Sequence, residues 1–508
     1  MQFNPVIKRT RNYNIKIILG SVIFLIIFLL SFLFKDCLID DAYITLTFSK
    51  NLFEHYHWGL NPLKISNTAT SPINVILSGL VGKIISSYEY APIFLTSIEY
   101  FVILLILYKL NINLKGNRII PFLIFPFALF NLLFLSSIGL ESVLYITLFT
   151  AAIYFNQKKY AVPLGCFLGL LTLARPDGIL LFFTIILFSE KNKNRSSIKK
   201  LDQRFYHSNS YKNKIIKYFL LITIPWYLIS WIFLHSIIPE TFFIKVHSSW
   251  DEHITFLSGY GLYIYKFPLE ALSSIITLPI LIYLVVRNGF RFSTNEKIIL
   301  CYVCLYIIGY SLLMVPPYHW YYIPVIYSFI LILYFQIIEF DHATNWYKKY
   351  YALPVIPFVF ILIFFLKNGE LILSEAPIHT NWATKADYKK VAMWLNSNID
   401  SNREILTNAE IGTLSFYANV PLINEFSSNI YLTNNVLQRF RNKDPFMKYL
   451  VKINFFWFHP TDTKENHVYY LRESRNSLKT FPVDAIKCWT FKSKWVNWSN
   501  LYLTFSSS

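Results

Sequence analysis

The sequence predicts an α-helical polytopic membrane protein that ends in an α/β domain outside the membrane. Of its 508 residues, 55% are hydrophobic and only 15% are charged, whereas a soluble domain has roughly 25% charged residues. Long apolar stretches recur along the first 367 residues, and near residue 368 charged and polar residues become frequent. These observations predict a membrane domain over 1–367 and a soluble domain over 368–508.

The first apolar stretch, residues 17–34, holds eighteen residues without a charge. That length crosses a hydrocarbon core as a helix. A cleaved signal peptide would have a shorter apolar region and a small-residue cleavage site, and neither is present. Basic residues precede the stretch, among them Arg9, Arg11 and Lys16. Because basic flanks stay on the cytoplasmic side, we expect a retained first span with a cytoplasmic N-terminus.

Further apolar stretches and basic clusters set the predicted topology, about eleven spans in all. The stretches lie near 92–110, 119–138, 142–156, 160–174, 177–189, 218–236, 268–286, 298–315, 321–338 and 351–366. The basic clusters are Lys115 with Arg118, Lys158 with Lys159, the nine Lys and Arg residues from Lys191 to Lys217, Arg287 with Arg291, and Lys348 with Lys349. All are predicted to face the cytoplasm. The net charge of +18 is therefore that of membrane-flanking loops, which argues against a nucleic-acid partner.

Two segments decide this topology. Residues 160–189 lie between two basic clusters and are interrupted by ARPDG, so we predict a hairpin of two short helices that turns at this motif. Residues 72–88 are only marginally apolar, and we predict a helix lying on the outer surface. The first outer loop then covers about 35–91, and the C-terminal domain lies on the outer side.

The C-terminal domain has patterns typical of a soluble α/β fold. Residues 386–399 have helical periodicity. EILTNAEIG predicts a strand and a turn, and VPLINEF predicts another strand. The domain is long enough to fold by itself.

Asp40 and Asp41 are adjacent carboxylates directly after the first span. Beside a membrane cavity such a group is partly desolvated, and its neighbour's charge raises its pKa further. A carboxylate tuned in this way can act as a general base toward a hydroxyl group. The alternative is that the pair only caps the following helix, since Asp is a favoured N-cap residue.

Four further polar spots are predicted on the same outer face. They are GLES with Glu141, ARPDG with Arg175 and Asp177, PETFFIK with Lys245, and PPYHWYY with Tyr318, His319, Trp320 and Tyr321. An arginine at membrane depth suits a phosphate, which it binds by charge and by paired hydrogen bonds. Lys245 is a second candidate for a phosphate contact.

Each spot also has a structural interpretation. Glu141 is at a helix start, where a carboxylate complements the helix dipole. Arg175 and Asp177 are close enough in sequence to form a local ion pair. The aromatic residues after Tyr318 suit an interfacial belt, although a histidine between two prolines and tyrosines is unusual there.

The order of these motifs resembles a known family. DDAYIT, FSKNL, GLNP, TSP, GLES, LGLLTLARPDGILL and IPETFFIK, followed by WLNSNIDSNREILTNAEIGTLSFYANVPLIN, look like the polytopic GT-C glycosyltransferases. Their order and spacing resemble a bacterial branch that includes arabinofuranosyltransferase-like proteins, more distantly related to protein O-mannosyltransferases and lipid A aminoarabinose transferases. The resemblance covers most of the chain as short motifs separated by variable helices.

The resemblance implies a GT-C type fold and an inverting transfer of a hexosyl or pentosyl sugar. The donor would be a polyprenyl-phosphate sugar, and the acceptor a glycan, a lipid or a protein. Asp40 would be the general base with Asp41 assisting, and Arg175 would hold the leaving phosphate. Glu141, Asp177, Tyr318, His319, Trp320 and Tyr321 would line the donor and acceptor pocket.

The chain departs from the family's pattern at two places. Members commonly have Glu where this chain has Asp177, and they often have Arg-Tyr after the DD motif, where this chain has Leu46-Thr47-Phe48. Lys50 is the nearest substitute for that arginine. No metal ligand is assigned, because two adjacent carboxylates are a thin ligand set for the divalent cation that is the alternative here.

Other classes fit less well. An O-antigen polymerase or ligase would need a large middle outer loop, but the loop at about 237–260 is small. A transporter of lipid-linked sugars usually has internal repeats with interrupted helices, and no such repeat is found. A membrane scaffold would leave Asp40, Asp41 and Arg175 without a role.

Overall fold

The fold was analysed in a computed structural model of the chain. The structure describes residues 5–62, 64–189, 201–246, 254–344, 352–368, 375–428, 445–457, 469–474, 481–493, 495–496 and 499–505. The basic cluster Lys348–Lys349 and the first part of the cluster that begins at Lys191 lie outside the described residues.

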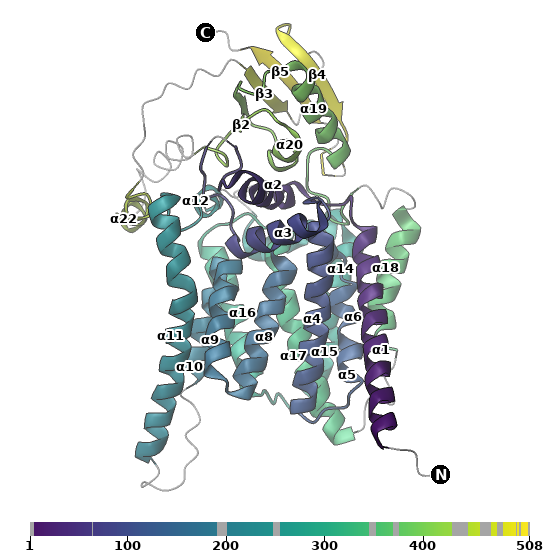
Figure 1. Cartoon of the computed structure of the whole chain (residues 1–508). Helices are drawn as coiled ribbons and strands as arrows, with labels where there is room; N and C mark the ends of the chain where they lie inside the picture. The colour runs from purple at the N-terminus through teal and green to yellow at the C-terminus, as the bar shows by residue number, and fades with distance from the viewer. Residues whose placement is uncertain are drawn as a thin grey trace.

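An upright bundle of apolar helices forms the larger part of the molecule (Figure 1). Five helices of the described chain are long and apolar enough to cross a membrane: Ala91–Asn113, Ser210–Phe233, Pro268–Arg287, Thr294–Leu312 and His319–Asp341. Their elements are α4 (Ala91–Asn113), α11 (Leu201–Phe233), α14 (Pro268–Ile275) with α15 (Thr277–Arg287), α16 (Thr294–Leu312), and η3 (His319–Tyr322) with α17 (Ile323–Thr344). The chain is therefore an integral membrane protein, as predicted.

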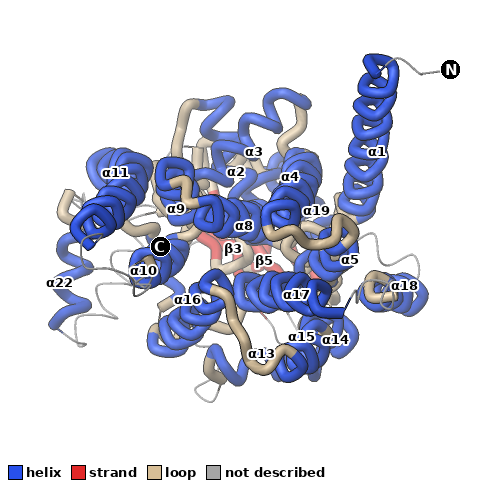
Figure 2. The backbone as a smooth tube through the Cα atoms, turned by 90° about the horizontal axis from the view of Figure 1, so that it is seen from below, coloured by secondary structure: helices blue, strands red, loops and turns tan. Residues whose placement is uncertain are grey.

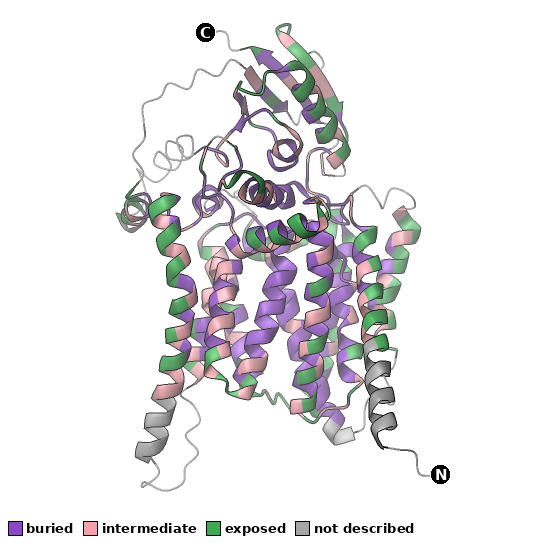
Figure 3. Cartoon of the chain, in the orientation of Figure 1, coloured by how far each residue is buried: buried purple, intermediate pink, exposed green. Residues whose placement is uncertain are grey.

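Further helices complete the bundle. One is α1 (Pro5–Leu33), whose apolar part is Ile18–Leu33. The others are α8 (Ser142–Lys158), α9 (Ala161–Ala174), η1 (Pro176–Gly178), α10 (Ile179–Phe188) and α18 (Val355–Asn368). The helix α8 is buried almost throughout and stands in the middle of the bundle with α17 (Figure 3). A hydrophobic core formed by both helices and their neighbours holds the bundle together.

The helix predicted within 72–88 is present. The helices α2 (Asp40–His55) and α3 (Pro72–Ile85) lie across the end of the bundle, where the upright helices stop (Figure 1). The side chain of Ser71 accepts a hydrogen bond from the amide of Asn74, and Pro72 occupies the first turn of α3. Both features favour the start of a helix at this point.

The predicted hairpin at ARPDG is also present. The helices α9 and α10 meet at the short η1 turn, and α9 packs closely against α11. A Cβ atom added at Gly165 would lie 2.6 Å from the carbonyl oxygen of Ile215, and one at Gly169 would lie 2.7 Å from the Cβ of Ile222. These small residues let two backbones approach, as at many helix contacts in membranes.

The apolar stretch 119–138 does not form one helix. It is divided into α5 (Ile120–Ile124), α6 (Pro126–Leu129) and α7 (Leu132–Leu135). Pro126 donates no backbone hydrogen bond. The side chain of Asn131 accepts a bond from the amide of Leu133 and starts α7 separately.

The basic loops gather at one end of the bundle, opposite to α2 and α3. Leu114, Gln157, Arg287, Arg291 and Glu339 line one cavity there, although they are far apart in the sequence. The described N-terminal end of α1 is at the same end (Figure 1). This agrees with the predicted alternation of the loops between two sides.

The C-terminal region, residues 375–505 as far as described, stands over the other end of the bundle. It has a five-stranded sheet in the order β2-β1-β3-β5-β4, and the strands lie behind the middle of the bundle in Figure 2. The strands are β1 (Ile405–Thr407), β2 (Leu422–Ile423), β3 (Tyr469–Ser474), β4 (Ala485–Phe491) and β5 (Ser499–Phe505). The helices are α19 (Lys385–Asn398), α20 (Gly412–Tyr417) and α22 (Pro445–Asn454).

The helix predicted at 386–399 and the strands predicted in EILTNAEIG and VPLINEF are α19, β1 and β2. Strand β1 pairs in parallel with both β2 and β3, and β5 pairs antiparallel with β3 and β4. The apolar faces of α19 and the sheet form a core of their own, which continues into residues of α2 and the first loop. The sheet is thereby fixed over α2.

Candidate active site

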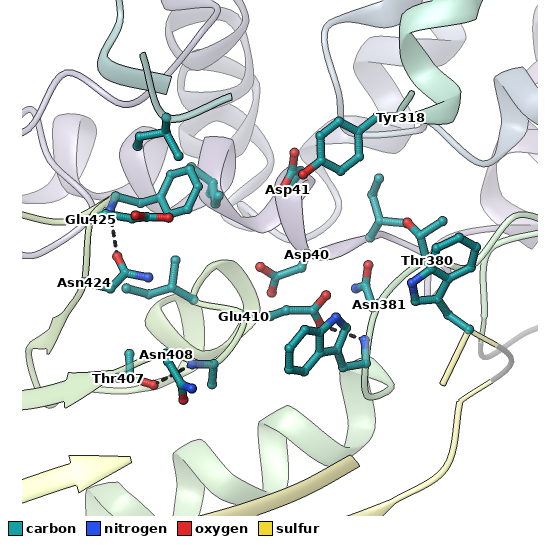
Figure 4. A pocket seen from close by; sticks show the side chains of 18 of the residues that line it. Asp40, Asp41, Tyr318, Thr380, Asn381, Thr407, Asn408, Glu410, Asn424 and Glu425 are labelled. Carbon is teal, nitrogen blue, oxygen red and sulfur yellow. Dashed lines mark hydrogen bonds between the residues drawn. The ribbon is translucent and has the colours of Figure 1, made fainter. Parts of the chain in front are cut away.

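A cavity of about 1030 Å³ lies between the bundle and the C-terminal region. One wall is formed by the start of α2, the end of α12 (Glu240–Lys245) and the segment Tyr318–Trp320. The other wall comes from the C-terminal region, mainly from the segments around Asn381, Glu410 and Asn424 (Figure 4). The predicted carboxylates are therefore inside a polar cavity at the end of the membrane helices.

Asp40 is held by the C-terminal region. It is 6% exposed, and its two carboxylate oxygens accept hydrogen bonds from the amides of Gly412 at 2.9 Å and Thr413 at 2.7 Å. Burial raises the pKa of Asp40 to about 6, although these hydrogen bonds lower it. Ile39 is the N-cap of α2 and no side chain caps that helix, so Asp40 does not cap α2. Its carboxylate instead accepts hydrogen bonds from the first two amides of α20 (Gly412–Tyr417).

Asp41 faces the cavity and is paired with Lys245. The ammonium nitrogen lies 3.0 Å from the carboxylate, and the Asp41 side chain is 32% exposed. Burial lowers the pKa of Lys245, but Asp41, Tyr321 and Tyr318 together raise it by more, so its pKa is above the ordinary value. The ammonium also lies 4.8 Å from the ring centre of Tyr318 and 5.5 Å from that of Trp320. Lys245 is therefore a charged group of the cavity wall.

Arg175 is buried beside this cavity in a cluster of tyrosines. Its Nη2 donates to the Oδ2 of Asp177 at 2.7 Å and to the hydroxyls of Tyr306 at 2.9 Å and Tyr310 at 2.7 Å. Its Nη1 is buried and has no hydrogen-bond partner in the described part of the chain. Buried donors are nearly always paired, so this atom is left for a ligand or a water.

The neighbours of Arg175 include the other predicted residues. The carboxylate of Glu141 lies 3.9 Å from its Nε, and the hydroxyl of Tyr310 donates to Asp177 at 2.6 Å. The local pair of Arg175 and Asp177 that the sequence offered as an alternative is thus present, within a larger network. Glu141 precedes α8 without capping it.

Tyr321 connects the two cations. The guanidinium of Arg175 lies 5.0 Å from the centre of its ring, and the ammonium of Lys245 lies 5.9 Å from it. An aromatic face attracts cations at these distances. Both predicted phosphate contacts therefore lie beside the same ring.

The rest of the PPYHWYY motif is divided between the cavity and the core. Tyr318 and Trp320 line the cavity and their rings stack at 4.6 Å. His319 is fully buried and packs edge-on against Tyr263 and Trp320. Lys50, the expected substitute for the family arginine, lines a separate cavity with Glu54 and Glu89.

The sequence interpretation missed the wall that the C-terminal region provides. Lining residues there include Asn381, Trp382, Asn408, Glu410, Asn424 and Trp495. A signal for Glu410 existed, because it follows the predicted strand EILT, and polar residues after the carboxyl ends of parallel strands commonly bind ligands. The sequence does not show how this sheet is oriented over Asp40.

The described residues contain no group of three or more His, Cys, Asp or Glu side chains arranged to hold a metal ion. The divalent cation considered beside Asp40 and Asp41 stays an untested alternative.

No protein-family model matches the chain, and no curated protein matches it in sequence. Among solved structures, ArnT from Cupriavidus metallidurans bound to undecaprenyl phosphate is similar at a TM-score of 0.54 and 13% identity, over 97% of this chain and 98% of that one. The apo state of that protein has a TM-score of 0.56 at 13% identity, over 96% of this chain and 98% of that one.

The arabinofuranosyltransferase AftD from Mycobacteria also matches, at a TM-score of 0.49 and 11% identity, over 90% of this chain and 35% of that one. The ArnT matches extend from the first helix region to the C-terminal region, so they cover the membrane bundle and the sheet together. The fold expected from the sequence motifs is thus confirmed: this chain has the fold of the two ArnT structures.

Proposed function

We propose that this protein is an inverting glycosyltransferase that moves a sugar from a polyprenyl-phosphate donor to a glycan, lipid or protein acceptor. Its site would face the outer side of a bacterial inner membrane, with the N-terminus in the cytoplasm. The observation that carries the proposal is the meeting of two carboxylates, Asp40 and Asp41, with Lys245 in one cavity where the membrane helices end. The buried Arg175 lies near this group, beside the ring of Tyr321 that Lys245 also approaches. The ArnT structure of the same fold is described as bound to undecaprenyl phosphate.

Arg175 and Lys245 would hold the donor phosphate. The buried Nη1 of Arg175 provides an unused donor, and Lys245 adds a second positive charge beside the ring of Tyr321. Guanidinium and ammonium groups are the usual protein ligands of phosphate. Glu141 and Asp177 would fix the guanidinium in place.

An apolar cavity of about 280 Å³ suits the isoprenoid part of the donor. It is lined by residues of α13 (Phe256–Lys266), α14, α15, α16 and α17. One of them, Phe256, has its ring 5.0 Å from that of Tyr310, which in turn contacts Arg175. A lipid chain in this cavity would leave its phosphate near the guanidinium.

Asp40 would act as the general base. The acceptor hydroxyl loses its proton to the carboxylate and its oxygen forms the new bond to C1 of the sugar. The bond between C1 and the phosphate oxygen breaks on the opposite face, and its electron pair leaves with the lipid phosphate. One base is sufficient, because no covalent sugar–enzyme intermediate is formed, in contrast to retaining hydrolases. The two amide donors fix the orientation of Asp40.

The remaining residues would form the pocket. Asp41 keeps Lys245 at the cavity wall, and the stacked rings of Tyr318 and Trp320 offer flat faces to a sugar. His319 supports Trp320 from the buried side.

The test is transfer of radiolabelled sugar from a mixed polyprenyl-phosphate donor pool to a broad acceptor panel, in membranes with wild-type protein or Asp40→Asn. We expect the variant to lose transfer by about 10²-fold or more, as for loss of a general base. Asp400→Asn is the matched control, because Asp400 is exposed in the C-terminal region and does not line the cavity.

Undiminished transfer by Asp40→Asn would move the base to Asp41. No transfer by folded wild-type protein from any lipid donor would overturn the proposed function.

A further inference from the structure

Glu410 belongs to the same short segment that holds Asp40. It lies between β1 and α20, only two residues before Gly412, whose amide donates to Asp40. Its side chain lines the cavity and is partly exposed there. Figure 4 shows Asp40 and Glu410 at the centre of the cavity, on opposite walls. The C-terminal region therefore adds a third carboxylate to the predicted pair.

Glu410 is linked to a second carboxylate behind it. The hydroxyl of Tyr388 lies 2.8 Å from Oε2 of Glu410 and 3.1 Å from Oε1 of Glu473. The amide of Glu410 donates to Oε2 of Glu473 at 3.3 Å. A hydroxyl has a single proton to donate, so Tyr388 cannot satisfy both carboxylates at once.

Two further donors, both uncharged, form hydrogen bonds with Glu410 and Glu473. The amide of Trp382 donates to Glu410 at 2.9 Å, and the hydroxyl of Ser499 donates to Glu473 at 2.6 Å. In the described part of the chain, neither carboxylate forms an ion pair. Two buried carboxylates without a cation are expected to retain a proton between them.

The surrounding charges act in the same direction. Burial raises the pKa of Glu410, and the charges of Asp40 on α2 and Glu473 on β3 raise it further. Burial also raises the pKa of Glu473 to about 7. The described cations that line the cavity have other neighbours: Lys245 pairs with Asp41. The ammonium of Lys266 lies 4.0 Å from the ring centre of Trp495, and the guanidinium of Arg472 lies 5.4 Å from that of Tyr470.

We propose that Glu410 and Glu473, bridged by Tyr388, form a relay pair that takes from Asp40 the proton that Asp40 has removed from the acceptor. The inference rests on the proposed function. In each turnover the proton passes from the acceptor hydroxyl to Asp40, then to the relay pair, and then to water in the cavity. Asp40 is thereby ionised again before the next acceptor binds. Glu410 and Glu473 are positioning residues, because they act through Asp40.

The first experiment measures transfer by the full-length protein against pH and buffer concentration, with Glu410→Gln and Glu410→Ala. We expect kcat at neutral pH to fall about tenfold, less than for loss of the base itself, with unchanged KM for donor and acceptor. Added acetate should restore the kcat of Glu410→Ala, because a small carboxylate fits the cavity and can carry the proton. The wild type should not respond to acetate.

Glu339→Gln is the matched control. Glu339 is exposed at the opposite end of the bundle, beside the basic loops. Its variant should keep the wild-type kcat and its independence of buffer. A kcat of Glu410→Ala that acetate does not raise would overturn the relay.

The second experiment does not depend on transfer. Infrared difference spectra of the full-length protein across neutral pH should show a protonated carboxyl band that both Glu410→Gln and Glu473→Gln remove. Absence of that band in a protein that transfers sugar would overturn the relay pair and leave the proposed function intact. The band without any transfer would overturn the proposed function while establishing the shared proton.

Discussion

Asp40 and Asp41 are chemically identical neighbours whose surroundings give them different tasks. Asp40 is enclosed by two backbone amides and by the apolar contacts of α2, whereas Asp41 is half open to the cavity and neutralised by Lys245. Burial without a cation keeps a carboxylate basic, while a paired cation makes it a poor proton acceptor. At the scale of the residue, the surroundings therefore favour Asp40 as the base and Asp41 as the ion-pair partner of Lys245.

A first prediction concerns pH. Because the pKa of Asp40 is raised to about 6, transfer should fall as pH decreases through 6, where half of the carboxylate becomes protonated. The profile of kcat/KM in the free enzyme reports this group. A profile that stays flat down to pH 5 would contradict the assignment of Asp40 as base.

The raised pKa of Asp40 makes stability depend on pH in the direction opposite to activity. The ordinary pKa of 3.8 is lower than the folded value of about 6, so between these values the folded protein binds more protons than the unfolded chain. The contribution of Asp40 to stability is therefore fully present below pH 3.8 and decreases as pH rises through 6. Activity and this part of the stability should change in opposite directions.

A second prediction concerns Arg175→Lys. Lysine keeps the charge but has no planar fork, so it cannot contact Asp177, Tyr306 and Tyr310 together while offering a free donor. We expect kcat/KM for the lipid donor to fall by roughly 10²-fold, as for loss of one oriented donor. Arg291→Lys, at the opposite end of the bundle, should leave transfer unchanged. Equal losses in both variants would argue against a phosphate contact.

At the scale of elements, the packing of α20 on α2 assembles the site. The start of α20 is placed directly over the start of α2, and a Cβ atom added at Gly412 would lie 2.1 Å from the carbonyl oxygen of Asp40. Real Cβ atoms do not approach an oxygen so closely, so glycine is required for the close contact. That contact brings the amides of Gly412 and Thr413 to the carboxylate.

A third prediction follows for Gly412→Ala. The methyl group should separate α20 from α2, remove both amide bonds from Asp40 and reduce transfer by about 10²-fold, as for other misplacements of a catalytic group. Hydrogen exchange at the amides of Gly412 and Thr413 should become faster. Gly309→Ala is the control, because nothing lies within 4 Å of an added Cβ there. Slow exchange at both amides in Gly412→Ala would contradict this account.

At the scale of the whole molecule, the site exists only where two bodies of structure meet. The membrane bundle brings Asp40, Asp41, Lys245 and Arg175, and the sheet above it brings Glu410 and most of the other cavity wall. Ion pairs at the periphery hold them together: Lys385 contacts Asp36 and Glu89, and Lys64 contacts Glu404. Transfer should therefore depend on residues far from the chemistry.

A fourth prediction tests this with Lys385→Ala. The side chain is 12% exposed, and its loss leaves Asp36 and Glu89 unpaired beside each other. Docking of the C-terminal region should weaken by about 1–3 kcal/mol, as for an unpaired charged hydrogen-bonding group. Faster proteolysis of the loops around α19 would report it. Lys390→Ala, whose ion pair with Asp387 is exposed and local, should behave like wild type.

The sequence by itself determined the membrane class, the surface helix at 72–88, the ARPDG hairpin and the main strands and helix of the C-terminal region. These features depend on local properties: hydropathy, loop charge, turn residues and periodicity, all of which are present in short windows. The candidate residues Asp40, Asp41, Arg175 and Lys245 were recognisable for a similar reason, because charged groups beside apolar spans are costly unless they have a use.

Only the tertiary structure decided how these residues are arranged. Asp40 meets Gly412 across 372 positions of the chain, Lys245 meets Asp41 across 204, and His319 is turned into the core while Trp320 faces the cavity. Such pairings depend on the packing of whole helices and on the position of the sheet over α2. No short window of sequence contains that information, because the residues next to each contacting side chain in the sequence are compatible with many orientations of that side chain.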